Sequence, residues 1–398
     1  MSPIGFVAIL ITAAAIPFGS VRFTLGRLLA ALALMLLHIA ATFWYYRYVQ
    51  FNVADTYFYY YTPANFAHIG FGIGTVFVVK ATQFLKMTFG ATYLDCIMMF
   101  QAFGFWGLMI MMRLFQEILA KTHSEATVLP TYLLFMPSIH FWTSAIGKDA
   151  PLFFAVSLCT WSVMNLSSRL IPFGVGLVVM VLFRAHIAMI TVVALAVAAL
   201  MHGRMTIGRK VMLLMVLVGG AGVLVNAVNS SLTIDVTSAG SVSNFFTERD
   251  NIAATASGGS SIGNAAFPIR LFALLFRPLF IDAGGLLGFV PSMENLGSLA
   301  LFTFLIIHRK TLRGLYRQVF FVRYALSLAM LLIFLLALIN YNVGLGLRQR
   351  VMIVPPLFAL LVATWAIRPR RMPVNYPQFG PNLLNNAGPN KPLTDIPS

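Results

Sequence analysis

The chain has 398 residues, a length that two or three soluble domains could fill. Its composition excludes that arrangement, because 59% of the residues are hydrophobic and only 10% are charged, whereas soluble domains have about 45–50% and about 25%. The net charge is +16, from 27 Lys and Arg against 11 Asp and Glu. No single water-soluble core could bury so much apolar side chain, so the sequence predicts a polytopic membrane protein.

Eleven apolar runs approach the length of about 17–25 residues that a membrane-spanning helix needs. They lie near residues 3–19, 27–46, 91–112, 128–143, 150–166, 170–183, 187–203, 211–228, 285–307, 324–340 and 351–367. The first run lacks the basic start and the small-residue cleavage site of a signal peptide, so it is counted as a span. The expected fold class is all-α, a transmembrane helical bundle of about 11 spans.

The bundle is expected to occupy residues 1–371, with interfacial helices in two long outer loops, 47–90 and 229–284. Residues 372–398 are rich in Pro and Asn and are expected to form a disordered cytoplasmic tail. With the N-terminus outside, most basic residues fall in inner loops such as His308–Arg323, as the positive-inside rule requires. A nucleic-acid-binding protein would instead gather its charge on one soluble face, and no such domain is predicted.

The first outer loop places a lone acid, Asp55, beside a cluster of tyrosines that includes Tyr59 and Tyr60. Asp55 is a candidate general base or metal ligand. The tyrosines could stack on sugar rings, or they could form the aromatic belt that is common at membrane interfaces. The following stretch, Thr75–Met87, mixes apolar and basic residues and predicts a helix lying in the outer interface.

Two further outer turns carry charge at expected helix ends. Lys148 and Asp149 stand at the start of a span, where Asp can cap backbone N–H groups and Lys can meet an anion held by them. The stretch 170–203 is too long for one span and suits two short ones that break at Arg184 and His186. Because a charge at membrane depth is costly, both are expected to face a polar cavity or a partner. The alternative is ordinary capping with snorkelling for Lys148 and Asp149, and a tight outer hairpin with a snorkelling arginine for Arg184.

The second half of the chain repeats this pattern. Arg270 and Arg277 are two helical turns apart in an otherwise apolar stretch, so both are expected on one helix face, where they could grip a lipid phosphate. Lipid anchoring without catalysis is the alternative. Further charged candidates in outer segments are Glu248, Arg249, Asp250, Asp282, Glu294, Arg348 and Arg350. Since these basic residues depart from the positive-inside pattern, they predict an outer cationic pocket for an anionic amphiphile.

Several of these motifs resemble GT-C-type membrane glycosyltransferases. They are the first outer loop Asp55–Tyr61, the short turn with Lys148 and Asp149, and the Arg-x-Arg run at 348–350 followed by Val351–Pro356. The runs Pro137–Asp149 and Phe276–Asp282 are similar to segments of bacterial exopolysaccharide and O-antigen polymerase-like proteins. The resemblance covers most of the chain in layout and five short motifs in residues.

This resemblance implies transfer of a sugar from a polyprenyl-phosphate-linked or polyprenyl-diphosphate-linked donor on the extracytoplasmic face. It makes Asp55 the catalytic acid of the first loop, and it makes Arg348 and Arg350 the pair that holds the departing phosphate. The family's fuller acidic motif is absent, and there is no Asp-x-Asp, so the use of a divalent metal stays open. Asp149, Glu248, Asp250, His186 and Glu294 are alternative bases.

The expected protein is therefore a glycosyltransferase or polymerase of the bacterial inner membrane, with its site facing the periplasm. It would build a cell-surface polysaccharide or glycoconjugate on a glycan, lipid-linked or protein acceptor. Donor phosphate would contact Lys148, Arg184, His186 and the four arginines 270, 277, 348 and 350. Two other functions stay open: a flippase for lipid-linked saccharides, and a non-catalytic membrane subunit of an envelope assembly complex.

Overall fold

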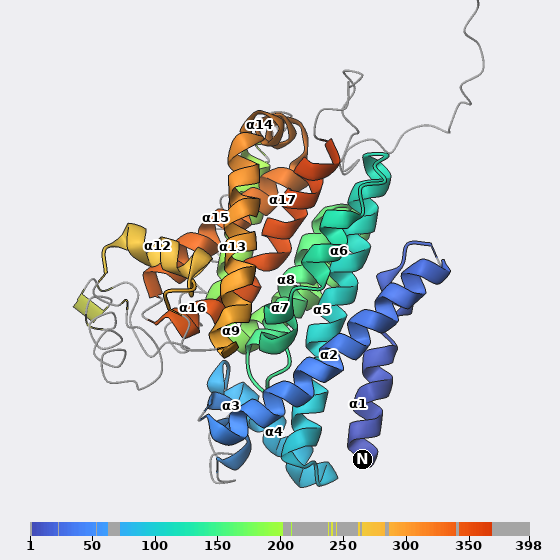
Figure 1. The fold of residues 1–398 in the computed structure, drawn as a ribbon, viewed down its shortest axis with the longest axis vertical. Coiled ribbons are helices and arrows are strands. Elements are labelled where there is room, and N and C mark those ends of the chain that lie inside the picture. The colour runs from blue at the N-terminus through green and yellow to red at the C-terminus, as the bar shows by residue number, and fades with distance from the viewer. Residues whose placement is uncertain are drawn as a thin grey trace, which may run out of the picture.

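The computed structural model is helical throughout the part of the chain that it describes (Figure 1). That part comprises residues 2–201 except 23, 53 and 63–71, residues 265–282, 286–339 and 342–367, and isolated positions at 208, 238, 240, 241, 244 and 262. The expected all-α class is confirmed there. The predicted span 211–228, most of the loop 229–284 and the tail 372–398 lie outside the described residues.

The described helices occur in two groups along the chain, from residue 3 to residue 200 and from residue 267 to residue 367. They are α1 (Pro3–Ala13), η1 (Pro17–Gly19), α2 (Leu25–Phe51), α3 (Asp55–Tyr61), α4 (Thr75–Phe89), α5 (Tyr93–Lys121), α6 (Val128–Leu134), α7 (Pro137–Trp142), α8 (Asp149–Val163), η3 (Leu166–Ser168), α9 (Leu170–Leu200), α12 (Phe267–Phe276), α13 (Leu286–Ile307), α14 (Arg309–Gln318), α15 (Phe320–Ile339), α16 (Val343–Gln349), η4 (Arg350–Met352) and α17 (Val354–Ile367).

By length and composition, five described helices could cross a membrane: α2, α5, α13, α15, and α9 when it is counted across its break at Arg184. A sixth candidate joins α16–η4 to α17 across a bend of 63°. The chain therefore has the helices of a membrane protein, whereas the predicted number of 11 spans is not confirmed. One predicted span, 128–143, is interrupted at Met136, whose backbone is extended before Pro137. A residue that precedes proline is disfavoured in the α conformation, which explains this break.

Helix α5 forms the centre of the bundle, and 78% of its most apolar window is buried. Helices α1, α2, α8 and α17 pack against it. Glycines on α5 allow its neighbours to approach closely: a Cβ at Gly104 would lie 2.3 Å from the backbone oxygen of Thr143, and one at Gly107 would lie 2.6 Å from the Phe153 ring. Small residues are a common means of close helix packing in membranes.

Buried polar contacts join α2 to α7 and to the turn that follows it. His38 and His140 place their Nδ1 atoms 3.2 Å apart, and the Thr42 hydroxyl donates to Ser144 Oγ at 3.0 Å. All four residues are fully buried. These contacts hold α7, and with it the turn leading to α8, against α2.

Helix α9 is a hairpin of two arms. Arg184, with φ −154° and ψ 89°, interrupts the helical backbone. On either side of it, the Thr191 hydroxyl lies 3.3 Å from Met180 Sδ, although eleven residues of straight helix would separate them by about 16 Å. The predicted break at Arg184 is therefore confirmed, and the two arms run antiparallel.

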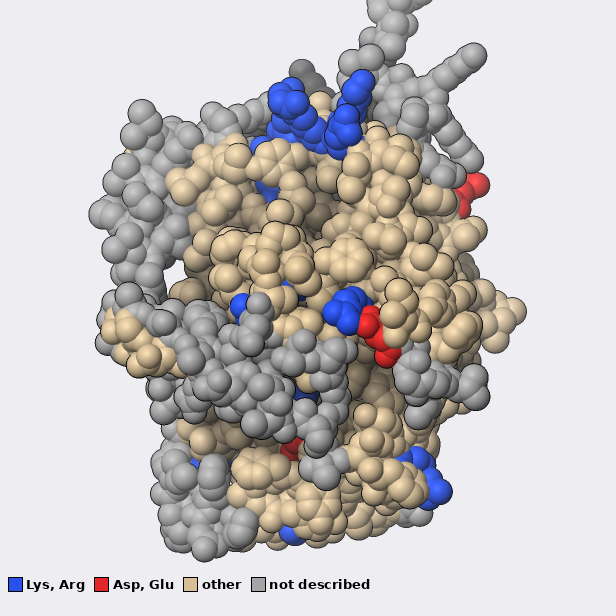
Figure 2. All heavy atoms as spheres, turned by 60° about the vertical axis from the view of Figure 1, so that its left-hand side comes forward, with Lys and Arg blue, Asp and Glu red and all other residues tan. Residues whose placement is uncertain are grey.

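The hairpin brings both ends of α9 to the upper end of the molecule in Figure 1, where α14 lies. There Arg169 Nη1 is 2.9 Å from Glu117 Oε2, and the Tyr316 hydroxyl of α14 is 2.7 Å from Met201 Sδ. Lys and Arg gather at this end in Figure 2, above a mainly uncharged band. The exposed basic residues of α14 are Arg309, Lys310, Arg313 and Arg317. We predict from this charge that the upper end is cytoplasmic.

The close approach at Gly104 gives a testable prediction. Gly104→Ala should lower the unfolding free energy by about 1–3 kcal/mol, because the new methyl group meets a main-chain oxygen that cannot rotate away. Thermal unfolding of the purified protein in one detergent measures the effect. Gly174→Ala is the matched control, since a Cβ at that helical glycine meets nothing within 4 Å. Equal melting temperatures for the two variants would show that α5 and the turn can separate without cost.

Candidate functional site

Five charged side chains from four distant segments converge toward the lower end of the bundle. We call Asp55, Lys148, Asp149, Arg184 and Arg348 the charged cluster. Asp55 and Asp149 are the first residues of α3 and α8, and Lys148 precedes α8. Arg184 lies at the break of α9, and Arg348 lies in the last turn of α16. Each side chain thus comes from a helix end or a helix break, where the chain can place charge without burying it inside a span.

Arg348 joins the two acids of the charged cluster. Its Nη1 is 2.7 Å from Asp55 Oδ2, and its Nε donates to Asp149 Oδ2. The two carboxylates differ sharply in exposure, since the Asp55 side chain is 61% exposed and that of Asp149 is 1% exposed. One guanidinium therefore holds an accessible carboxylate beside a buried one.

The buried Asp149 carboxylate has a second cationic partner. Arg184 Nη2 lies 3.4 Å from Asp149 Oδ1, so each oxygen of the carboxylate faces one guanidinium. A buried charge is tolerated only when it is paired and hydrogen-bonded. Asp149 was predicted to cap its helix, but its side-chain contacts are with the two arginines.

Lys148 brings a third cation to the charged cluster. Its ammonium group donates to the Thr75 hydroxyl at the start of α4, at 2.9 Å. Burial, with a further contribution from the neighbouring charge of Arg184, lowers the pKa of Lys148 from its usual 10.5 to about 8, although Asp149 opposes the shift. Three cations face two carboxylates, so the charged cluster carries one excess positive charge when Lys148 is protonated.

Two glycines allow the backbone to come this close. Gly74 has φ +70° and ψ −127°, a conformation that residues with a Cβ rarely adopt. Its N–H donates to the Leu182 oxygen at 2.8 Å, which fixes the start of α4 against the α9 turn. At Gly147, a Cβ would lie 3.4 Å from Arg348 Nη2 and 3.6 Å from the Tyr59 ring. The turn before α8 therefore lies directly against Arg348.

Aromatic and imidazole side chains border the charged cluster. Tyr59 is buried beside it, and burial, with a smaller contribution from Asp55, raises the pKa of its hydroxyl to about 12. Tyr45 of α2 pairs with Thr56, the residue after Asp55, at 2.9 Å. His186 interacts electrostatically with Arg184 and Lys148, and neither of its buried ring nitrogens has a hydrogen-bond partner among the described residues. His186 thus retains donor and acceptor capacity at the site.

The structure places other predicted residues away from the charged cluster. Arg350 Nη1 donates to the Leu275 oxygen at 2.7 Å, whereas Arg348, two residues earlier, faces Asp55 and Asp149. Glu294 is buried, with Oε1 accepting from the Ser138 N–H at 2.9 Å. The Arg348–Arg350 pair is thereby divided between two environments.

The prediction that Arg270 and Arg277 share one helix face is wrong. Helix α12 ends at Phe276, and Arg277 follows it in an extended conformation because Pro278 comes next. Arg277 forms a bidentate ion pair with Asp282, which lowers the pKa of that carboxyl group. Arg270 Nη2 instead donates to the Leu338 oxygen at 2.8 Å.

The remaining predicted residues divide in two groups. The Tyr60 hydroxyl donates to the Ala91 oxygen at 3.0 Å, which joins α3 to the turn between α4 and α5. Glu248, Arg249 and Asp250 lie outside the described residues.

Sequence reasoning missed three neighbours of the charged cluster: Thr75, Thr56 and Tyr45. Thr56 follows Asp55 and Thr75 begins a predicted helix, whereas Tyr45 lies near the end of the predicted span 27–46 and carried no signal of its own. Within the described part of the chain, no three His, Cys, Asp or Glu side chains are grouped closely enough to hold a metal ion.

Comparisons of the chain with protein-family models, with curated proteins and with solved structures find no match.

The role of Arg348 can be tested through stability. Arg348→Met should lower the unfolding free energy by about 3–5 kcal/mol, because it removes one partner of the buried Asp149 carboxylate. Arg47→Met, at an exposed arginine of α2, is the control and should change it by less than about 0.5 kcal/mol. Thermal unfolding in detergent gives both values. Adding Asp149→Asn to Arg348→Met should restore part of the loss; no recovery would contradict the pairing.

The shifted pKa of Lys148 predicts a pH-dependent anion site. Sulfate keeps its charge between pH 7 and pH 9.5, so a change in its affinity over this range reports on the protein. Affinity should fall as the pH rises through about 8, by up to about tenfold per pH unit, because the ammonium group loses its proton. Isothermal titration or ligand-induced thermal shifts would measure it. Lys148→Arg should remove the pH dependence, and an unchanged profile in that variant would exclude Lys148 as its source.

Proposed function

We propose that this protein is an integral membrane glycosyltransferase or polymerase that acts on the extracytoplasmic face. Its donor would be a sugar linked to polyprenyl phosphate or diphosphate, and its product a cell-surface polysaccharide or glycoconjugate. One observation carries the proposal: an accessible carboxylate, Asp55, is held by Arg348 beside an excess of buried positive charge. An acid and a phosphate-binding group at one membrane-embedded position are what such a reaction needs.

In the proposed reaction the acceptor hydroxyl attacks the anomeric carbon of the donor sugar. Asp55 takes the proton of that hydroxyl, a new glycosidic C–O bond forms, and the bond between the anomeric carbon and the phosphate oxygen breaks. The electron pair of the broken bond leaves with the polyprenyl phosphate or diphosphate. Charge that develops on this leaving group would be stabilised by fixed cationic groups.

Lys148 and Arg184 are the cations best placed for that role. Arg348 already contacts both carboxylates, while Lys148 has one described contact, to the Thr75 hydroxyl, and an ammonium group has three donors. Arg184 contacts Asp149 at the longer distance of 3.4 Å. His186, whose two ring nitrogens have no hydrogen-bond partner in the described part of the chain, could add a hydrogen bond to the same phosphate.

A lipid tail would have apolar surface beside the charged cluster. The contact between Lys148 and Thr75 places the start of α4 at the site. The same helix exposes Phe84, Met87 and Phe89, each more than half accessible, and bears Lys86, which lies 4.6 Å from the centre of the Tyr60 ring. These features support α4 as an interfacial helix that borders a lipid-linked donor.

The proposal is tested with the purified protein in liposomes that contain a polyprenyl-phosphate sugar and an acceptor glycan. Asp55→Asn should reduce transfer by about 10²–10⁴-fold, the usual contribution of a general base. Asp282→Asn is the control, because that acid pairs locally with Arg277, and it should retain wild-type transfer.

Three outcomes of this assay would count against the proposal. Equal transfer by Asp55→Asn and the wild type would exclude Asp55 as the base. Movement of the labelled donor across the bilayer without transfer would favour a flippase. Lack of both activities with every donor, in protein that unfolds cooperatively, would favour a non-catalytic subunit.

A further inference from the structure

A cavity of about 510 Å³ lies at the upper end of the bundle, opposite the charged cluster. Helices α2, α5 and α6 and the turn between α5 and α6 line it. Helix α2 packs on α5 and α7, and the cavity occupies the space between its first half and α6. Its volume is in the range of small-molecule sites, which hold about 300–1,000 Å³.

The deeper wall of the cavity is apolar. Leu34 of α2, Met112 and Phe115 of α5 and Leu134 of α6 contribute to it. The outer faces of the same helices expose further large apolar side chains: Leu25, Leu29 and Leu32 on α2 and Val128 on α6. This exposed apolar surface beside the cavity suits contact with lipid, and a lipid chain would reach the cavity from the bilayer across it.

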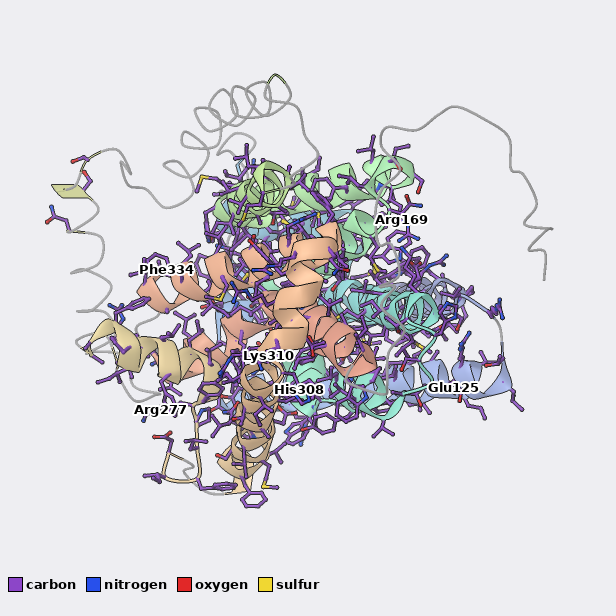
Figure 3. The ribbon with its side chains drawn as sticks, turned by 90° about the horizontal axis from the view of Figure 1, so that it is seen from above. Glu125, Arg169, Arg277, His308, Lys310 and Phe334 are labelled. Atoms are coloured by element: carbon purple, nitrogen blue, oxygen red, sulfur yellow. The ribbon has the colours of Figure 1, made fainter. Side chains whose placement is uncertain are left out.

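The two charged residues of the lining have opposite signs and come from opposite walls. Arg27 lies in the first turn of α2, and Glu125 lies in the turn between α5 and α6. Seen from above, Glu125 lies beside the α2 end of the bundle (Figure 3). Arg27 donates to the Arg22 oxygen at 3.0 Å, and among the described residues neither Arg27 nor Glu125 belongs to an ion pair.

A third polar residue of the lining is already satisfied. Gln116 accepts from the Val21 N–H at 3.1 Å and donates to the Gly19 oxygen at 3.0 Å. Gln116 therefore closes the cavity against the turn after α1. Ser124, Thr127 and Thr131 add hydroxyl groups to the lining, and its two charged groups are those of Arg27 and Glu125.

We propose that this cavity binds a phospholipid whose headgroup carries a phosphate and a primary ammonium group. An acyl chain would lie against the apolar wall, the guanidinium of Arg27 would contact the phosphate, and the carboxylate of Glu125 would accept hydrogen bonds from the ammonium group. A singly anionic headgroup leaves Glu125 without a partner, and a quaternary ammonium group has no N–H to donate. The cavity thus selects phosphoethanolamine over phosphoglycerol and phosphocholine headgroups.

This site is independent of the proposed transfer reaction, since it lies at the other end of the bundle. It does share α2 with the charged cluster, because Tyr45 of α2 holds Thr56 next to Asp55. A lipid bound between α2 and α6 would hold the first half of α2 in place.

Native mass spectrometry of the full-length protein tests the proposal, with phosphatidylethanolamine, phosphatidylglycerol and phosphatidylcholine of identical acyl chains. The wild type should bind phosphatidylethanolamine about tenfold more tightly than the other two, the ratio that one charge-assisted hydrogen bond can give. Glu125→Gln should abolish this preference, and Arg27→Gln should weaken all three lipids.

Filling the cavity provides a second test. Gly26 lines the cavity, and a Cβ there meets nothing within 4 Å, so Gly26→Leu has room at its Cβ and should reduce lipid binding at least tenfold by occupying part of the cavity. Gly174→Leu, at a glycine with equally open surroundings outside the cavity lining, should bind as the wild type does. Equal affinity for the three headgroups, a preference that survives Glu125→Gln, or full binding by Gly26→Leu would each overturn the proposal. Sugar transfer is not needed for either readout.

Discussion

The structure around the charged cluster depends on one buried carboxylate. Asp149 is almost fully enclosed, and its two oxygens face Arg184 and Arg348. An unpaired charge at this position would cost several kcal/mol, so the start of α8, the break in α9 and the end of α16 must lie where these contacts form. The accessible Asp55 then acquires its place from the same arginine. The geometry of the candidate site is in this sense a consequence of satisfying one charge in an apolar bundle.

A second group of charged side chains joins neighbouring helices at the other end of α8. Glu117 of α5 pairs with Arg113 and Arg169 and accepts from the Trp161 indole at 3.0 Å. Arg169 immediately precedes α9, so the first arm of the hairpin is tied to its neighbours by charge at both of its ends. Between these two groups most packed side chains are apolar, with Ser157, Thr160 and Thr191 among the buried polar ones. Ionic contacts at their ends therefore set the register of α8 and α9, and hydrophobic side chains pack between those ends.

The sequence predicted individual residues of the charged cluster, because charged residues are scarce in this chain. In a chain with only 10% charged residues, Asp55, Lys148, Arg184 and Arg348 were recognisable because each stands beside an apolar run. Their mutual contacts were not predictable, since Arg348 is 293 residues from Asp55 and 199 from Asp149, and only tertiary packing decides which ends meet. Arg350 has the same local pattern as Arg348, yet it contacts the Leu275 oxygen because the turn η4 directs it elsewhere.

The apolar runs predicted the helices more reliably than they predicted where the helices are interrupted. The fold back at Arg184 followed from length alone. Two other breaks were not predicted, the end of α12 before Pro278 and the interruption at Pro137. Both arise because proline disfavours the helical conformation of the residue before it, even where the hydrophobic pattern continues. Spacing of seven residues predicts one helix face only while the helix continues, which is why the pairing of Arg270 with Arg277 failed.

The length of α8 has a consequence for the surrounding bilayer. Its 15 residues span only about 22 Å, less than the hydrocarbon thickness of about 30 Å, and the arms of α9 on either side of Arg184 are of similar length. Helix α8 is buried in the bundle, but where the short arms of α9 meet lipid, a bilayer would become thinner or water and headgroups would reach the tip of the hairpin. Either response would shorten the path between the lipid headgroups and Asp149. Hydrophobic mismatch would then bring polar molecules close to the charged tip of the hairpin.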